Sequence, residues 1–571
     1  MADWYEPLPE EQRAWHLLNR VTFGPRPGDV ARVEKMGAKA FLEEQLHPER
    51  INDSAVERKI AGLPTLSMSP EELAENFPAK NQAQQQAQAR AQERGKGSEG
   101  SDSAEMTRPN PGRDMAAMPG PGAMQEPEGP RRITMELARE QLWRAIYSPR
   151  QLEEVMVQFW MNHFNIFAGK GADRWLITSF ERHAVRPHAL GKFEDLLVAT
   201  AKSPAMLFYL DNWLSVAPYT TTEGSVYRTL SGMAPETEEP GRPAAVRPVT
   251  WNPSRFPLSP GQQRPRPFAK IQNRRGLNEN YARELMELHA LGVEGGYTQQ
   301  DVREVARCFT GWTINRPLQG GSFFFNPRLH DFGAKAVLRH KIKPGGGEKD
   351  GLEVLHMLAH HPSTAHFISL KLCRRFVADD PPASVVNRAG KAFLKSKGDL
   401  RAVLRSIVTS PEFNSSAAFR AKVKSPFELV ASSLRALDGQ TDAGPPLLAA
   451  MVRMGQPLFY YQAPTGFPDR GSAWINSGTL LQRINFATLL AANRIRGTQV
   501  DLHAVAPDSG PNEVVKELSD RLVGGELSPE TRQAIVKTVD GSEAPALGGP
   551  WAAPALKVVA VLVASPDFQR R

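Results

Sequence analysis

The densest group of residues that could do chemistry lies in the segment Asn278–Gly292. An asparagine at its start and a glycine at its end predict a helix of about three turns. On such a helix Asn280, Glu284 and Glu287 share one face, because successive residues are rotated by about 100°. Two carboxylates three residues apart could bind a divalent metal ion together or act as a general acid and base.

Three further side chains are candidates for the same site. His289 lies beside the apolar face of this helix, Glu304 lies on the helix predicted to begin at Thr298, and His163 ends an aromatic run. The candidate metal ligands are His163, Glu284 and Glu287, which would make a divalent metal ion the cofactor. The candidate catalytic residues are Glu284, Glu287, His289 and Glu304.

A structural role is the alternative for these residues. Glu284 and Glu287 could form a solvated face opposite a core stripe, with Arg283 as their ion partner. A histidine on an apolar helix face, such as His163, is more often a hydrogen-bonded core residue than a metal ligand. The segment also lacks the Glu-x-x-His pair of the usual helical di-iron site.

Other polar residues have simpler structural interpretations. Thr298 and Asp301 have the spacing of a capping box, which explains this carboxylate without catalysis. His356 and His360 stand one helical turn apart, as metal ligands can. The His361-Pro362 pair that follows is typical of a helix end and a new helix start, so the structural interpretation is preferred there.

Helical periodicity runs through most of the chain and must position these residues. We predict a mainly α, multi-helix globular fold with at most one short β-hairpin, near residues 322–342. There, Phe323–Phe325 and Val337-Leu338 flank a polar turn that contains His330-Asp331. By composition, the helical segments are residues 1–77, 133–216, 269–440 and 441–571.

Two low-complexity stretches interrupt the helical pattern. Residues 78–132 are rich first in Gln and Ala and then in Gly, Pro and Met, and residues 217–268 are rich in Pro. Neither stretch can bury enough apolar surface to offset the entropy lost on ordering. We therefore predict two disordered insertions.

Basic charge is concentrated in one place. The chain of 571 residues has a formal net charge of +8, and Pro240–Asn278 contains eight basic residues and no acidic one. This loop is either a solvated linker or a polyanion site. Aromatic residues are sparse there, so we do not expect a nucleic acid as the ligand. The candidate polyanion-binding residues are Arg255, Arg264, Arg266, Lys270, Arg274 and Arg275.

Several common classes of protein are excluded by what the sequence lacks. It contains no apolar run long enough for an ordinary transmembrane helix, and its two cysteines cannot form a disulfide scaffold. It has no phosphate-binding loop, nucleophile elbow, His-Glu-x-x-His motif or dinucleotide fingerprint. Met1–Glu6 offer no apolar core of a secretory signal, so a cytoplasmic location is expected by default.

A series of short motifs runs through the chain. They are His16–Pro25, Phe159–Phe164, Leu207–Asn212, Asn278–Gly292, Tyr297-Thr298, Ala306-Arg307, Thr310–Trp312, His330-Asp331, Lys371-Leu372, Arg375–Val377, Pro426–Glu428, Gly455-Gln456, Pro464-x-Gly466 and a terminal Ser-Pro-Asp-Phe-Gln-Arg. In this order they resemble the bacterial family named domain of unknown function 1800. The resemblance covers nearly the whole chain apart from the two insertions.

The resemblance implies a predominantly helical fold and leaves the activity open, because that of the family is not established. Members of the family often look exported. Their genes often neighbour a second family, domain of unknown function 1501, which resembles sulfatases and commonly bears a twin-arginine signal. Our first expectation is therefore a helical interaction protein, or scaffold, that works with a co-encoded partner of this second family and could leave the cell bound to it.

Two alternative functions are also compatible with the sequence. One is a carboxylate-dependent or metal-assisted enzyme that acts on a cell-envelope polymer through the candidate residues above. The other is polyanion binding through the basic loop, whose affinity would fall steeply with salt.

Overall fold

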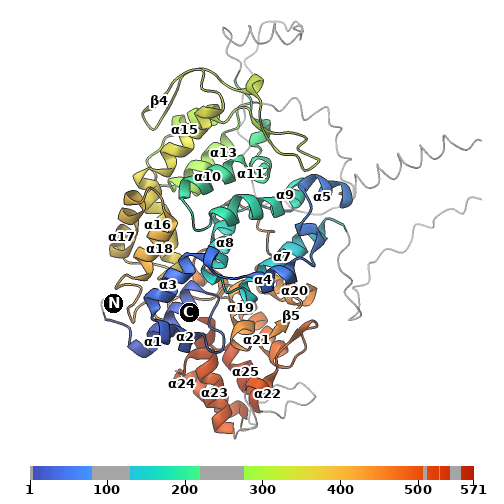
Figure 1. The fold of residues 1–571 in the computed structure, drawn as a ribbon, viewed down its shortest axis with the longest axis vertical. Coiled ribbons are helices and arrows are strands. Elements are labelled where there is room, and N and C mark those ends of the chain that lie inside the picture. The colour runs from blue at the N-terminus through green and yellow to red at the C-terminus, as the bar shows by residue number, and fades with distance from the viewer. Residues whose placement is uncertain are drawn as a thin grey trace, which may run out of the picture.

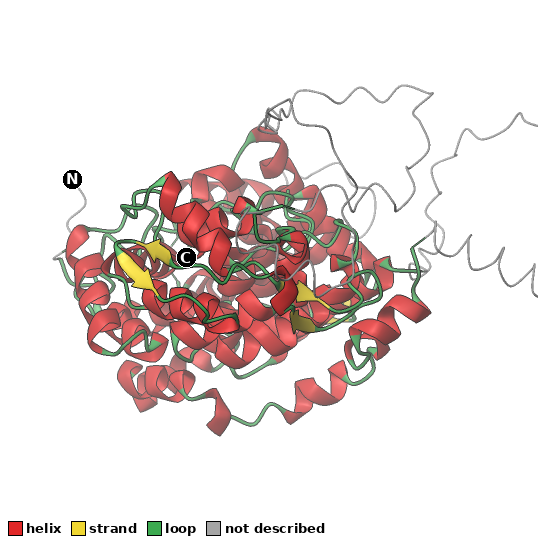
Figure 2. Cartoon of the chain, turned by 90° about the horizontal axis from the view of Figure 1, so that it is seen from above, coloured by secondary structure: helices red, strands yellow, loops and turns green. Residues whose placement is uncertain are grey.

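Helices dominate the protein, which confirms the predicted fold class (Figures 1 and 2). The computed structural model describes residues 4, 6–79, 129–218, 276–505, 511–525, 527–539 and 554–571. Most of the two predicted insertions, residues 78–132 and 217–268, lies outside these ranges, as do all the candidate polyanion-binding residues. No helix in the described ranges combines the length and apolar character needed to cross a bilayer.

The first half of the chain forms two groups of helices. The N-terminal group consists of α1 (Glu10–Val21), α2 (Asp29–Met36), α3 (Ala38–Leu46), α4 (Ser54–Ile60) and α5 (Pro70–Asn76). The second group consists of α7 (Arg131–Tyr147), α8 (Gln151–His163), α9 (Asp173–Ser179), the π-helical η3 (Phe180–Val185), α10 (Phe193–Lys202) and α11 (Pro204–Tyr209).

The second half continues the helical architecture. Its first group is α13 (Glu279–Glu284), the π-helical η8 (Leu285–Ala290), α14 (Gln299–Cys308), α15 (Glu348–Ala359), α16 (Pro362–Phe376), α17 (Ala383–Lys395), α18 (Leu400–Val408) and α19 (Pro426–Ala436). The last group is α20 (Pro445–Arg453), α21 (Ser477–Ala491), α22 (Leu502–Val505), α23 (Pro511–Val523), α24 (Pro529–Val539), α25 (Pro554–Ala564) and α26 (Pro566–Gln569).

Short 3-10 turns connect several of these helices. They are η1 (Pro48–Arg50), η2 (Pro64–Leu66), η4 (Arg186–His188), η5 (Asn212–Leu214), η9 (Pro327–Leu329) and η10 (Gly471–Trp474).

Local sequence explains where many of these helices begin and which face they bury. Ser69 and Ser425 each precede a proline and form a capping box, in which the serine side chain and a glutamate satisfy free backbone N–H groups. In α18 the apolar residues recur at the helical period and are buried, so this stripe packs into the core. They are Leu400, Val403, Leu404, Ile407 and Val408.

The strands form small two-stranded sheets, and here the predicted hairpin pairing is wrong. Strand β2 (Phe323–Phe325) pairs with β1 (Trp312–Ile314), whereas β3 (Lys335–Val337) pairs with β4 (His340–Ile342). Leu338 and Arg339 both have positive φ and form the two-residue turn that joins β3 to β4. Strand β3 therefore pairs with β4 and not with β2. A third pair joins β5 (Gln440–Thr441) to β6 (Thr498–Gln499).

One irregular segment rich in turns, residues 414–424, holds both ends of the described chain. Near its start Leu8 N–H donates to the Asn414 carbonyl, and near its end Lys422 and Arg571 exchange two backbone hydrogen bonds of 2.8 and 3.1 Å. Figure 1 shows the N and C ends in the same region of the molecule. The middle of the fold is also built from residues far apart in sequence, since α7 and α8 lie there together with α16 and α19.

Candidate functional site

The predicted carboxylate face lies where an α-helix changes into a π-helical turn. Asn278 caps α13 by accepting a hydrogen bond from the Asn280 N–H at 2.8 Å, as predicted. The α-helix then continues as the π-helical η8, which carries Glu287 and His289. Such π-helical turns are frequent at functional sites. Arg283 pairs with Glu279 at 3.5 Å, and its charge also acts on Glu284, whose pKa it lowers against the larger effects of burial and Glu287.

Glu284 has the electrostatic environment of an acid–base group. Burial, reinforced by the nearby charge of Glu287, raises the pKa of Glu284 to about 7. The Tyr297 hydroxyl donates to Glu287 Oε2 at 3.3 Å, and burial raises the pKa of Tyr297 to about 12. A carboxyl that titrates near neutral pH suits general acid or base chemistry.

Buried Asp173 adds a further acidic group near this face. Neither of its carboxylate oxygens has a hydrogen-bond partner, and burial raises its pKa well above the ordinary value. The charges of Asp173 and Glu284 both raise the pKa of Tyr209, after the larger effect of its own burial, so both carboxyl groups lie within electrostatic range of this residue.

The two candidate histidines meet in the core. His163 Nε2 donates to the His289 carbonyl at 3.1 Å, and their ring centroids are 6.3 Å apart. Both side chains are buried. Burial, followed by the charge of Lys371, lowers the pKa of His289 to about 3 and that of His163 well below its ordinary value. Both imidazoles are therefore neutral, and His163 makes the kind of hydrogen bond expected of a core histidine.

Glu304 belongs to a separate structural cluster. Helices α13 and α14 do pack together, but Glu304 accepts hydrogen bonds from Arg307 at 2.8 Å and from the Ala336 N–H at 3.1 Å. The neighbouring Asp301 completes the predicted capping box with Thr298 and also accepts from the Leu338 N–H at 2.7 Å. These carboxylates anchor the β3–β4 hairpin to α14.

His330 is also held by structural contacts rather than by the adjacent Asp331. Its Nε2 lies 3.2 Å from Asp350, which also binds the buried Lys335 at 2.6 Å. Asp331 instead pairs with Arg307 at 2.7 Å.

The candidate metal ligands do not gather into one coordination set. Within the described ranges, one group of three His, Cys, Asp or Glu residues has its ligand atoms all within 4.8 Å of one another. That group is Glu194, His356 and His360, and it includes none of His163, Glu284 and Glu287.

A cavity of about 140 Å³ lies beside Asn162, between α8, α16, α19 and the segment 456–474. Its apolar lining includes Phe159, Phe427 and Trp474. We call it the central cavity. Its polar lining is Gln141, Gln158, Asn162, Asn165, Arg375, Lys422, Ser425, Glu428, Gln456, Asp469 and Arg571.

Ion pairs hold the charged wall of this cavity. Glu428 Oε1 accepts from Arg375 at 2.9 Å and from Arg571 at 3.0 Å. Asp469 binds Lys371 at 2.8 Å through its carboxylate and Lys422 at 3.0 Å through its carbonyl. Lys422 also pairs with Asp379, and Arg20 lies close enough to affect the same charges.

Several cationic side chains gather in this cluster, and some of their donors have no partner. Arg20, Lys371, Arg375, Lys422 and Arg571 lie among the side-chain carboxylates of Asp379, Glu428 and Asp469. Buried and without a hydrogen-bond acceptor are Arg20 Nε, Arg375 Nη1, and Nε and Nη1 of Arg571. These four atoms are shielded from solvent, and Arg20 does not line the cavity, so an anion in the cavity would instead meet the charges of the lining residues Arg375, Lys422 and Arg571.

Burial lowers the pKa values of Arg20, Arg375 and Lys422. It lowers the pKa of Arg20 to about 9, with the neighbouring charge of Arg375 as the second cause. It also lowers the pKa values of Arg375 and Lys422, while Glu428 and Asp379 respectively act in the opposite direction. The guanidinium groups remain charged at neutral pH and can attract an acidic group into the cavity.

The segment over the cavity is held by Asn162 of the aromatic run and by Asn165, which follows it. Asn162 exchanges two hydrogen bonds of 2.7 and 2.9 Å with the backbone of Phe467, and Asn165 donates to the carbonyls of Tyr461 and Ala463. Gly466 crosses Asn162 so closely that an added Cβ would lie 2.1 Å from the Asn162 carbonyl oxygen. This close approach, together with a φ of +70°, requires glycine.

Residues that line the central cavity come from five of the motifs on which the family resemblance depends. They are Phe23, Asn162, Arg375, Glu428 and Gln456, each from a different motif. Sequence reasoning missed this site, because it looked for chemistry within single segments and these residues are separated by tens to hundreds of positions. The motif series itself was the signal that could have found it.

Comparisons with known proteins place the chain by family alone. Neither the curated proteins nor the solved structures contain a match to it. The family model described as a protein of unknown function, DUF1800, matches residues 16–570, and the chain therefore belongs to this family.

Proposed function

We propose that the protein is an interaction protein whose central cavity holds an acidic group of its partner. The observation that carries this proposal is the set of cationic side chains that line the cavity, namely Arg375, Lys422 and Arg571. A carboxylate or phosphate oxygen in the cavity would interact with their charges and could accept charge-assisted hydrogen bonds from them.

The size of the cavity favours a single group over a whole cofactor. Its volume of about 140 Å³ is below the roughly 300–1,000 Å³ of typical small-molecule sites. A carboxylate side chain or a chain terminus of a second protein fits this volume. The exposed Pro468 and partly exposed Asp469 line the same cavity, which gives such a group a route from the surface.

The partner we propose is the co-encoded protein of the family domain of unknown function 1501. This choice comes from the family resemblance, in which genes of the two families are frequent neighbours. A twin-arginine signal on that partner would allow both proteins to be exported as a complex. The cavity would then recognise an acidic residue on the surface of the partner.

The test measures the affinity of the full chain for this partner with two arginine variants. Arg375→Gln removes a donor that lines the cavity and should weaken binding by about tenfold or more, since charge-assisted hydrogen bonds contribute about 1.5–3 kcal/mol. Arg470→Gln is the matched control, because Arg470 is exposed, pairs with Asp380 at 2.6 Å and does not line the cavity.

Circular dichroism must first confirm that both variants are folded. Weaker binding by Arg375→Gln alone supports the proposal. Absence of a complex with the wild-type chain, or equal affinity of the two variants, contradicts it.

A second candidate function is a carboxylate-dependent enzyme that acts on a cell-envelope polymer. The specific observation in its favour is the pKa of about 7 at Glu284, beside Glu287 and Tyr297. If Glu284 is the general acid, Glu284→Gln should lower the release of soluble fragments from purified polymer by about 10²-fold or more. Release by the variant at the wild-type rate, or no release by either protein, would reject this candidate.

A further inference from the structure

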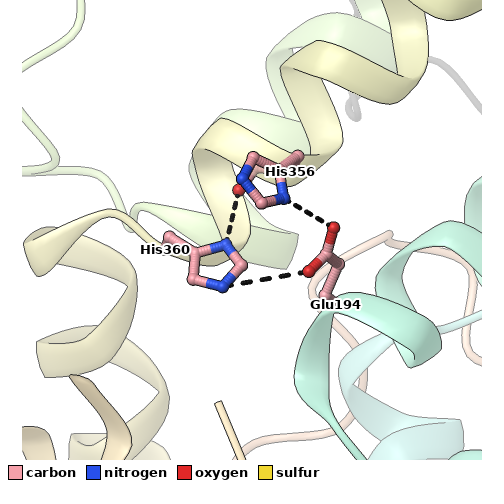
Figure 3. Close-up of side chains that lie close together, drawn as sticks. All are labelled: Glu194, His356 and His360. Carbon is pink, nitrogen blue, oxygen red and sulfur yellow. Dashed lines mark hydrogen bonds and ion pairs between the residues drawn. The ribbon is translucent and has the colours of Figure 1, made fainter. Parts of the chain in front are cut away.

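A pair of histidines and a glutamate come together outside the central cavity. His356 lies on α15, His360 directly follows that helix, and Glu194 lies in the first turn of α10 (Figure 3). The four-residue spacing places both imidazoles on one side of α15, where α10 packs against it. Each of the three residues offers a ligand atom, and these atoms all lie within 4.8 Å of one another.

The carboxylate of Glu194 bridges the two imidazoles. Its Oε1 lies 2.8 Å from His356 Nδ1 and its Oε2 lies 3.8 Å from His360 Nε2. The ring centroids of the two histidines are 4.5 Å apart. Because a carboxylate only accepts, His356 Nδ1 donates the hydrogen bond to Glu194 Oε1, and a metal ion would take the place of that proton. Two imidazole nitrogens and one carboxylate oxygen form a ligand set that suits Zn²⁺.

The hydrogen bond on the far side of His360 assigns its tautomer. His360 Nδ1 lies 2.9 Å from the carbonyl oxygen of His356, and because a carbonyl only accepts, Nδ1 carries the proton. The lone pair of a neutral His360 is then on Nε2, which faces Glu194 Oε2 across a gap too wide for a hydrogen bond. Metal-bound histidines commonly donate their other ring N–H to a backbone carbonyl in this way.

We propose that Glu194, His356 and His360 bind a single Zn²⁺ ion. Tetrahedral bonds of about 2.0 Å place ligand atoms roughly 3.3 Å apart, so small side-chain rotations close the site. The side chains of His356, His360 and Glu194 are 65%, 31% and 30% exposed, which gives the ion access and leaves room for water as the fourth ligand. The bound ion would fasten α10 to α15.

The test is a calorimetric titration of the full chain, purified without a polyhistidine tag, with Zn²⁺. We expect one ion per chain, and we expect His356→Gln and His360→Gln to lower the affinity by about 10- to 100-fold or more. His340→Gln is the matched control, because His340 forms an exposed pair with Glu353 at 2.7 Å but belongs to no group of three candidate ligands in the part of the chain that the structure describes. Its affinity should equal that of the wild type.

Two further measurements keep the test decisive if a variant is unstable. Zn²⁺ should raise the melting temperature of the wild-type chain and of His340→Gln, because the ion binds the folded state. Co²⁺ bound to the wild-type chain should give the visible absorption spectrum of a four-coordinate site with nitrogen and oxygen ligands. A wild-type chain that binds no Zn²⁺, or binding that survives in both His356→Gln and His360→Gln, would overturn the proposal.

Discussion

At the scale of single residues, burial decides the protonation of the groups that matter most. It keeps His163 and His289 neutral, so they contribute packing and one hydrogen bond rather than charge. It raises the pKa of Glu284, where a second carboxylate adds to the effect. The arginines around Glu428 stay charged because their ordinary pKa lies so far above neutral.

The raised pKa of Glu284 predicts a pH-dependent cost to stability. Its pKa is 4.5 in the reference state and about 7 in the folded protein, so the folded chain binds an extra proton between these values. The free energy of unfolding should therefore fall as pH rises from about 4.5 to 7. Glu284→Gln removes this fall, and at pH 8 should be more stable than wild type by about 1–2 kcal/mol after allowance for solvent screening.

Urea denaturation of both proteins between pH 4.5 and pH 8 measures this difference. The exposed Glu294→Gln serves as the control and should show no growing difference from the wild type. A constant offset between Glu284→Gln and the wild type across this range would show that Glu284 titrates normally.

At the scale of elements, the segment 456–474 forms one wall of the central cavity and depends on one glycine. Gly466 is buried, has a φ of +70° and crosses the backbone of Asn162. The hydrogen bonds from Asn162 and Asn165 then fix the segment against α8 and the residues that follow it. The cavity wall is therefore a loop held by a helix end, and not a regular element.

Gly466→Ala should destabilise the protein by about 1–3 kcal/mol, because the added Cβ meets a backbone oxygen in a conformation that only glycine adopts easily. Gly478→Ala is the control, since Gly478 lies in α21 and its Cβ would meet nothing closer than 3.4 Å. That change should be neutral or stabilise by up to about 1 kcal/mol. Equal stabilities of the two variants in chemical denaturation would contradict this account of the loop.

Local sequence patterns predicted the helices correctly, but they did not predict the contacts between elements. The capping box of Thr298 and Asp301 and the helix start at His361-Pro362 are present as expected, because both depend on neighbours within a few residues. The pairing of Phe323–Phe325 was wrong, because the sequence pattern does not say which of two nearby strands an apolar run joins. The partnership of Glu194 with His356 spans 162 positions and has no local signal.

At the scale of the whole molecule, the two ends of the described chain meet on one segment and the apolar core is continuous. A single cluster of buried apolar residues extends from Ala14 to Phe568. Residues 414–424 pair with the N-terminal segment at Leu8 and with the C-terminal segment at Arg571. Arg571 also binds Glu428, so the closure of the fold and the wall of the central cavity share a residue.

This continuity predicts cooperative unfolding. Calorimetry of the full chain should show one main transition in which the calorimetric and van't Hoff enthalpies agree, because the described helices share one apolar core. Two well-separated transitions would show that the helical groups are independent domains and would contradict the prediction.

The measurement that tests the central claim most directly is the melting temperature in sodium phosphate compared with sodium chloride at equal ionic strength. An anion in the central cavity should stabilise the wild type and Arg470→Gln more than it stabilises Arg375→Gln, by about 2.7 kcal/mol at a concentration 100-fold above Kd. The general effect of phosphate on protein surfaces is common to all three proteins and cancels in this comparison. Equal shifts in the three proteins would contradict the claim that the cavity recognises an acidic group.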